Sequence, residues 1–150
     1  MAASGYRKLI EDFCVAAGIS DPDRVLRGSQ LRIDGMAIQL EYIEADDQCR
    51  VAIDLGPIPE AVERDCHRLM LAWNVEPGAD GMQIMGIDPE SGRATLVLRI
   101  PLSLLEQGGG LFALLDERLD PVREAWEDLL DELGMPPPRG EAFPALGQLA

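Results

Sequence analysis

The stretch from Leu31 to Leu55 restricts what this chain can fold into more than any other part of the sequence. Within it, Asp34-Gly35 separates two segments in which apolar and polar residues alternate. Such a two-residue link favours a tight β-hairpin, because Asp and Gly tolerate the positive φ angles that these turns require. The link predicts two cross-strand pairs, Ile33 with Met36 and Leu31 with Ile38.

The same alternation continues into a second hairpin, whose predicted loop is Glu44 to Asp47. This loop predicts three further apolar pairs, Tyr42 with Cys49, Leu40 with Val51 and Ile38 with Ile53. Both registers gather apolar side chains on one face and leave polar ones on the other, namely Arg32, Gln39, Glu41, Arg50 and Asp54. A slip of one residue would reverse this sorting, so the register is well specified. A sheet with one apolar face must be covered by helices.

Three segments with the apolar spacing of an amphipathic helix supply that cover. They run from about Ser4 to Ala17, from Glu60 to Asn74 and from Leu111 to Leu133. Pro121 is expected to kink or interrupt the last of them. Residues 20–23 are interpreted as a turn, after which Val25 and Leu26 lead into the first strand.

Two more strands, Met82 to Ile87 and Ala94 to Ile100, flank a loop of turn-forming residues from Asp88 to Gly92. The sequence therefore predicts an α+β fold, with a single antiparallel five-stranded sheet and three helices in the order α-β-β-β-α-β-β-α. We expect this domain to span residues 1–134. The Pro-rich segment 135–150 is predicted to be a disordered tail.

Composition and charge narrow the class of protein. The 150 residues are 47% hydrophobic, which suits one domain with a sizeable core, and no apolar run approaches the about 20 residues that span a bilayer. With 27 acidic against 13 basic residues, the net charge of -14 argues against binding to nucleic acid or insertion into a membrane. The N-terminus lacks a signal-peptide core, so we expect a cytoplasmic protein. Cys14, Cys49 and Cys66 lack metal-like spacing, and we expect them to be reduced and buried.

Catalytic chemistry finds little support in the sequence. The one histidine, His67, follows Cys66 on a predicted helix, where adjacent side chains point about 100° apart and do not readily form a joint site. Gly108 to Gly110 lacks the Lys-Ser/Thr of a phosphate-binding loop and is interpreted as a hinge before the last helix. No motif for a metal or another cofactor appears, so we expect neither, and we expect no enzyme activity.

Two stretches carry a resemblance to a known family. The first, Gly86-Ile-Asp-Pro-Glu-Ser-Gly-Arg-Ala-Thr-Leu-Val-Leu-Arg-Ile-Pro-Leu102, is similar to the last hairpin of the class I type III secretion chaperones, the Tir/CesT-like family. The second, Ala125-Trp126 with Leu129-Leu130, is similar to the C-terminal helix of that family. With the element order and the acidic charge, the resemblance covers roughly Tyr6 to Leu133. The triple glycine and the Pro-rich tail depart from the family pattern.

The resemblance implies a bacterial homodimer that binds the N-terminal chaperone-binding segment of a secreted effector and keeps it soluble and competent for secretion. Such chaperones hold the segment in extended form, with its apolar side chains in surface grooves and a short stretch added to a sheet edge. Two other classes stay open. One is a protein-binding regulatory dimer of similar fold that has no part in secretion, and the other is a small enzyme of unknown type.

The expected effector groove lies beside the first helix and the first three strands. Its predicted contacts are six apolar residues: Tyr6, Leu9, Phe13, Leu31, Ile33 and Ile38. The alternative for each of these residues is that it only builds the core of the monomer.

The expected dimer contact uses the second helix. One apolar stripe from Val62 to Trp73 is enough to cover the sheet, and Leu71 lies roughly opposite that stripe. A symmetry-related copy would bury this leucine in a self-complementary contact. The predicted interface residues are Ala61, Arg64, Arg68, Leu71 and Ala72. The competing possibility is that Met70 and Trp73 form the contact while other residues cover the sheet.

Overall fold

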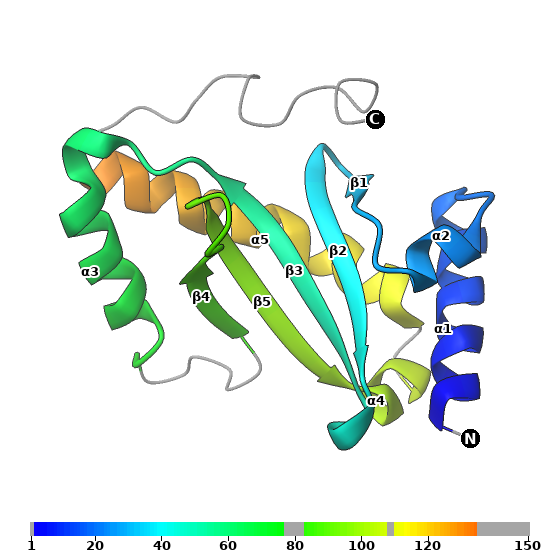
Figure 1. The fold of residues 1–150 in the computed structure, drawn as a ribbon. Helices are drawn as coiled ribbons and strands as arrows, with labels where there is room; N and C mark the ends of the chain where they lie inside the picture. The colour runs from blue at the N-terminus through cyan, green and yellow to red at the C-terminus, as the bar shows by residue number, and fades with distance from the viewer. Residues whose placement is uncertain (1, 77–82, 108–109, 135–150) are drawn as a thin grey trace.

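The computed structural model describes residues 2–76, 83–107 and 110–134 of the 150-residue chain (Figure 1). Five strands form one antiparallel sheet in the order β1-β2-β3-β5-β4. The strands are β1 (Leu31–Ile33), β2 (Met36–Ile43), β3 (Gln48–Gly56), β4 (Gln83–Ile87) and β5 (Ala94–Pro101). The predicted α+β fold with a single antiparallel five-stranded sheet is confirmed.

The three predicted helices are present as α1 (Ala2–Ala17), α3 (Glu63–Trp73) and α5 (Gly110–Glu132). A short 3-10 turn, Glu60–Val62, leads into α3. Figure 1 shows α5 crossing one face of the sheet, with α1 beside the β1–β2 end and α3 at the opposite end, next to β4. The apolar face of the sheet is therefore covered by α5, and the two ends of the sheet meet different helices.

The predicted strand registers are confirmed. Leu31 pairs with Ile38 and Ile33 with Met36 across the first turn. Ile38, Leu40 and Tyr42 pair with Ile53, Val51 and Cys49 across the second. Asp34 and Gly35 adopt φ angles of 51° and 80°, as a turn with two left-handed residues requires.

The core lies between the apolar face of the sheet and the helices. Strand residues such as Leu40, Val51 and Ile53 are fully buried there. The buried side chains of α5 repeat along one face of that helix: Leu111, Leu115, Leu119, Trp126 and Leu130. Full burial of a side chain of this size contributes roughly 1.5–3 kcal/mol, so this row is a major source of stability.

Two short helices were not expected from the sequence. Helix α2 (Pro22–Leu26) replaces the predicted turn and lead-in to the first strand. The Asp21 side chain accepts a hydrogen bond from the Arg24 N–H at 3.3 Å, and Pro22 occupies the first turn of the helix, so the local signals for a helix start were present. Helix α4 (Leu102–Gln107) follows β5, and its Leu102 and Leu105 are buried.

Pro121 does not interrupt the last helix. Helix α5 runs through it as one element, so of the two expected outcomes, a kink or a break, the break does not occur. Pro121 is exposed, whereas Leu119 and Trp126 on either side of it are buried. Proline inside a helix costs about 3 kcal/mol. Burial of the apolar row on both sides of Pro121 outweighs that cost.

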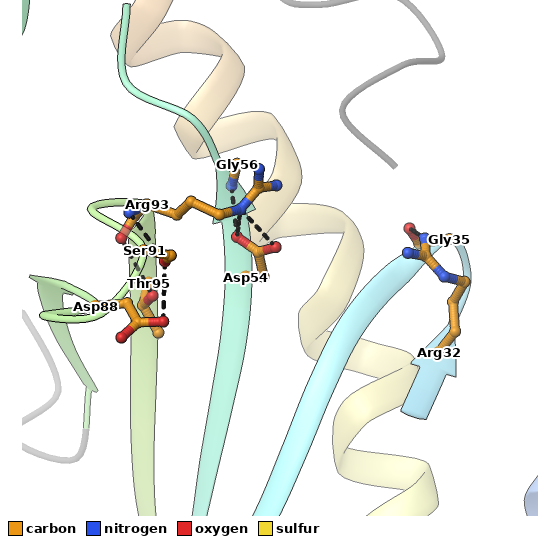
Figure 2. A network of polar contacts seen from close by, with 8 residues as sticks. All are labelled: Arg32, Gly35, Asp54, Gly56, Asp88, Ser91, Arg93 and Thr95. Carbon is orange, nitrogen blue, oxygen red and sulfur yellow. Dashed lines mark hydrogen bonds and ion pairs between the residues drawn. The ribbon is translucent and has the colours of Figure 1, made fainter. Parts of the chain in front are cut away.

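A polar network ties the end of β3 to the loop before β5 (Figure 2). The Arg93 Nε donates to both carboxylate oxygens of Asp54, at 3.1 and 3.0 Å, and the Gly56 N–H donates to Asp54 Oδ1 at 3.0 Å. The register of β3 against β5 shifts between Asp54 and Gly56. The Asp54 carboxylate therefore satisfies the backbone where the strand ladder is irregular.

The side chain of Asp88, the first residue of the loop from Asp88 to Gly92, holds that loop together by hydrogen bonds. The Asp88 carboxylate accepts hydrogen bonds from the Glu90 N–H at 3.0 Å and the Ser91 hydroxyl at 2.9 Å. These bonds favour the charged carboxylate and lower the pKa of Asp88.

The predicted burial of Cys14, Cys49 and Cys66 is confirmed. Within the described ranges, no helix is long and apolar enough to cross a membrane. The predicted tail (135–150) and the hinge residues 108 and 109 lie outside the described residues.

Candidate functional site

Strand β1 is too short to pair with the whole length of its neighbour β2. Strand β1 has 3 residues and pairs only with Met36 to Ile38, whereas β2 has 8 residues. Among the described strands, none pairs with the outer side of β2 from Gln39 to Ile43. This part of the sheet is an edge whose backbone groups are available to an added strand. We call it the β2 edge.

The turn geometry determines which backbone groups point outward along the β2 edge. In a two-residue hairpin, the pair that closes the turn exchanges both backbone hydrogen bonds, and this pair is Ile33 with Met36. Alternate residues of a strand point their N–H and C=O to the same side, so Leu40 and Tyr42 present theirs to the open side beyond β1. No backbone bond outside the strand ladders engages these groups within the described part of the chain.

A groove of about 530 Å³ runs along the β2 edge. Its floor is β2 from Gln39 to Tyr42, and its walls come from the start of α1 and from the end of α2 with the residues that follow. The wall residues are Tyr6, Arg7, Leu26, Arg27 and Gly28. The Gln39 Nε2 donates to the Gly28 carbonyl at 2.6 Å and so holds the loop after α2 against the strand.

Two tyrosines meet in this groove. The Tyr6 and Tyr42 rings stack with centroids 4.9 Å apart, and the Tyr42 hydroxyl donates to Asp47 Oδ1 at 2.7 Å. The hydrogen bond to Asp47 is the main cause that raises the pKa of Tyr42 to about 12, and burial raises the pKa of Tyr6. Both phenols therefore stay protonated at neutral pH. The Tyr6 ring is buried, and the half-buried Tyr42 ring stacked on it gives the groove its aromatic surface.

The other edge of the sheet is protected. The Asp88 N–H donates to the Arg93 carbonyl at 2.9 Å, and counting back along β4 from this pair shows that Met85 points its backbone groups outward. The Asn74 side chain takes both of them: its Nδ2 donates to the Met85 carbonyl at 3.0 Å, and the Met85 N–H donates to Asn74 Oδ1 at 2.8 Å. An amide side chain thus occupies the position that a partner strand would take at Met85.

Five of the six predicted effector contacts belong to the buried core, and the sixth, Leu31, is half-buried on β1. Three of the buried five also border a groove: Tyr6 borders the β2 edge groove, and Leu9 and Phe13 border a second groove of about 450 Å³ between α1, α4 and α5. Ile33 and Ile38 border neither groove. The sequence reasoning missed Leu40, Tyr42 and the α2 wall as parts of a site, although the short run before Asp34-Gly35 indicated a short first strand.

The predicted interface residues lie on one exposed surface. Ala61, Arg64, Arg68, Leu71 and Ala72 are all exposed. Leu71 is 67% exposed, and Val75 extends the same surface with 80%. Cys66 and Met70 face the core instead.

No joint catalytic site forms around Cys66 and His67. Cys66 is buried, and burial raises the pKa of its thiol. His67 Nε2 lies 4.0 Å from Glu63 Oε1 on the same helix. The residues that the structure describes contain no group of His, Cys, Asp or Glu side chains that could hold a metal ion.

Comparisons with known proteins agree with this architecture. One solved structure with a similar fold is entitled the HopA1-SchA chaperone-effector complex. The match has a TM-score of 0.59 at 18% identity and covers 85% of this chain and 94% of the matched chain. Another is the ExsC-ExsE complex, with a TM-score of 0.55 at 15% identity over 83% of this chain and 90% of the matched one. No curated protein sequence matches.

The family assignment rests on a sequence model. The model of the Tir chaperone protein (CesT) family matches residues 8–123, which run from α1 through the whole sheet into α5. This range is well over half of the chain. The protein belongs to the Tir chaperone protein (CesT) family.

Proposed function

We propose that the protein is a bacterial cytoplasmic chaperone of type III secretion. It binds the N-terminal segment of a secreted effector in extended form and keeps that segment soluble and competent for secretion. The observation that carries the proposal is the β2 edge, which combines outward backbone groups with an aromatic groove in a chain of this family. The family is one of chaperones, and we propose no catalytic role.

The effector segment would add to the sheet as a strand beside β2. Its backbone would exchange hydrogen bonds with Leu40 and Tyr42, which gives affinity without regard to side chains. Every second side chain of the segment would enter the groove against Tyr6, Tyr42 and Leu26. Selectivity would come from these alternate positions, because side chains alternate between the two faces of a strand.

The second groove offers a place for apolar side chains further along the same segment. Leu9 and Phe13 of α1 form one wall, and Leu105, Leu111 and Phe112 form the other. The Phe13 and Phe112 rings lie 6.3 Å apart. Since α1 contributes to both grooves, an extended segment would pass from one to the other along this helix.

The acidic surface suits a holding role. A net charge of -14 favours solubility and opposes aggregation, which offsets the apolar surface of an unfolded cargo. Holding a segment in extended form needs only binding energy and no chemical step.

We further propose that two copies associate through α3 and the turn before it. The contact surface would be Ala61, Arg64, Arg68, Leu71 and Ala72, with Leu71 at its centre. The small alanines let a symmetric copy approach closely, and each Leu71 would be buried in a self-complementary contact.

A pair of variants at Tyr42 tests the β2 edge. Tyr42→Ala and Tyr42→Pro both remove the aromatic ring, but only Tyr42→Pro also removes the outward backbone N–H. One hydrogen bond contributes about 0.5–1.5 kcal/mol, so Tyr42→Pro should bind the effector segment about 2- to 12-fold more weakly than Tyr42→Ala. Calorimetric titration with the N-terminal segment of a candidate secreted effector that the wild type binds measures both affinities.

The control for that pair of variants is a check that both keep the native fold. An outward N–H on an edge strand is dispensable to the sheet, so circular dichroism of Tyr42→Pro should match that of Tyr42→Ala. Equal affinities for the two natively folded variants would contradict strand addition at β2.

A further inference from the structure

A third cavity lies at the end of the sheet remote from the β2 edge. It has a volume of about 260 Å³ and opens between α3 and the C-terminal half of α5, above side chains of β3, β4 and β5. Figure 1 shows α3 and the C-terminal end of α5 at the β4 end of the sheet, across the sheet from α1. Its apolar surface includes Trp73 of α3 with Trp126 and Leu129 of α5. We call it the tryptophan pocket, because these are the only two tryptophans in the sequence.

The rim of the tryptophan pocket is acidic. Glu76 follows α3, and Asp128 and Glu132 lie on the last turns of α5, so three carboxylates from two elements converge on one opening. Among the described residues that line the pocket, none is basic. The two grooves beside α1 differ in this respect, since each mixes acidic with basic residues. The rim groups are exposed.

Size and chemistry together define the occupant. Pockets for whole small molecules usually exceed about 300 Å³, so this cavity suits one or two side chains of a peptide. An indole face attracts a guanidinium or ammonium group, and the carboxylates around it add to the attraction. An aliphatic side chain next to the cation would fill the apolar floor formed by Leu55, Met85 and Leu96.

We propose that the tryptophan pocket is a second docking site, for a partner segment in which arginine or lysine stands next to leucine-like side chains. It is separate from the β2 edge and does not depend on the function proposed for that edge. The segment binds through its side chains, with its cation over an indole and among Glu76, Asp128 and Glu132. Strand addition plays no part at this end of the sheet, because the Asn74 side chain occupies the β4 edge at Met85.

The tryptophan emission of the protein reports on this pocket, because both tryptophans line it. The probe is a short tryptophan-free peptide of leucine and arginine, and its control has the same leucines with glutamate in place of arginine. The arginine peptide should change the tryptophan emission saturably, and the glutamate peptide should not. This comparison uses the wild-type protein. No change with the arginine peptide, or equal changes with both peptides, overturns the proposal.

Two matched triple variants locate the effect. Glu76→Gln/Asp128→Asn/Glu132→Gln removes the rim charges, and Asp116→Asn/Glu117→Gln/Glu124→Gln removes the same number of exposed charges elsewhere on α5. Each exposed ion pair is worth about 1.4- to 5-fold in affinity, so the rim variant should bind the arginine peptide about tenfold more weakly. The α5 control should bind it as the wild type does. Equal weakening of both variants shows general charge attraction and overturns the proposal.

Two alternative occupants of the tryptophan pocket, a second copy of the chain and its own C-terminal segment, can be distinguished by experiment. Binding of the arginine peptide that weakens as the protein concentration rises would assign the pocket to a second copy of the chain, which would compete with the peptide. Emission that shifts on Phe143→Ala without any peptide would assign it to the chain's own C-terminal segment. Either result overturns the proposal, whereas a peptide affinity independent of protein concentration and an emission unchanged by Phe143→Ala support an external partner.

Discussion

At the scale of single residues, Asn74 decides the state of one sheet edge. Asn74→Ala removes two hydrogen bonds and leaves the Met85 backbone without them. We expect the free energy of unfolding to fall by about 1–3 kcal/mol, as measured by urea denaturation. Asn74→Asp keeps an acceptor for the Met85 N–H but places a carboxylate oxygen against the Met85 carbonyl oxygen, so it should not restore the wild-type stability. An unchanged stability of Asn74→Ala would show that the side chain does not hold the edge.

Tyr42 gives a second prediction at this scale, through pH. Its hydrogen bond to Asp47 raises the pKa of Tyr42 to about 12, and the unfolded value is about 10. The folded state thus favours the protonated phenol, and the stability from this group is fully present below pH 10 and is lost as pH rises through 12. Ultraviolet titration should show little phenolate near pH 10, because burial also raises the pKa of Tyr6, the other tyrosine.

The matched variant for this titration is Asp47→Ala. It removes the acceptor of the Tyr42 hydroxyl, so part of the phenolate signal should move down toward pH 10. A wild-type protein that ionises one tyrosine near pH 10 while still folded would contradict the role of Asp47.

At the scale of elements, Pro121 inside α5 is expected to lower the stability of that helix. Pro121→Ala restores a helical N–H and removes a clash, which is worth about 3 kcal/mol in a helix interior. Without proline the unfolded chain has greater conformational entropy, which lowers the expected gain in the free energy of unfolding by about 0.4–1 kcal/mol. We therefore expect a gain of about 2 kcal/mol in the free energy of unfolding, measured by urea denaturation. Glu124→Ala, at another exposed position of α5, should change stability little. A destabilised Pro121→Ala would show that α5 needs the proline to fit the sheet.

At the scale of the whole molecule, the dimer proposal makes a prediction about mass. The chain has a mass of 16.4 kDa, and light scattering should give about twice that value for the wild type. Leu71→Glu places two like charges in a self-complementary contact, so the mass should fall toward that of one chain while circular dichroism stays native-like.

Val15→Glu is the matched control for that variant. Val15 is 84% exposed on α1, at the other end of the sheet from α3, so this variant should keep the dimeric mass. A wild type that is monomeric at high micromolar concentration would contradict the dimer. A dimeric Leu71→Glu would contradict this interface.

Local pattern alone was enough to predict most of the fold. The Asp34-Gly35 link and the alternation around it determined the registers of β1, β2 and β3, because a slip would move every side chain to the wrong face. Helical periodicity likewise located α1, α3 and α5. The exposure of Leu71 followed from its position opposite the stripe that faces the core. These features depend on residues close together in the sequence.

Only the tertiary structure decided where the molecule is open. The β2 edge is open because β1 has only 3 residues, and α2 forms a wall of the groove beside that edge, whereas the β4 edge is filled by a side chain from another element. Pro121 stays within a helix because α5 side chains before and after it, such as Leu119 and Trp126, are buried against other parts of the fold. The division of the six predicted contacts between those that border a groove and those that do not has the same origin. Each outcome depends on packing between segments far apart in the chain, and local periodicity carries no information about such packing.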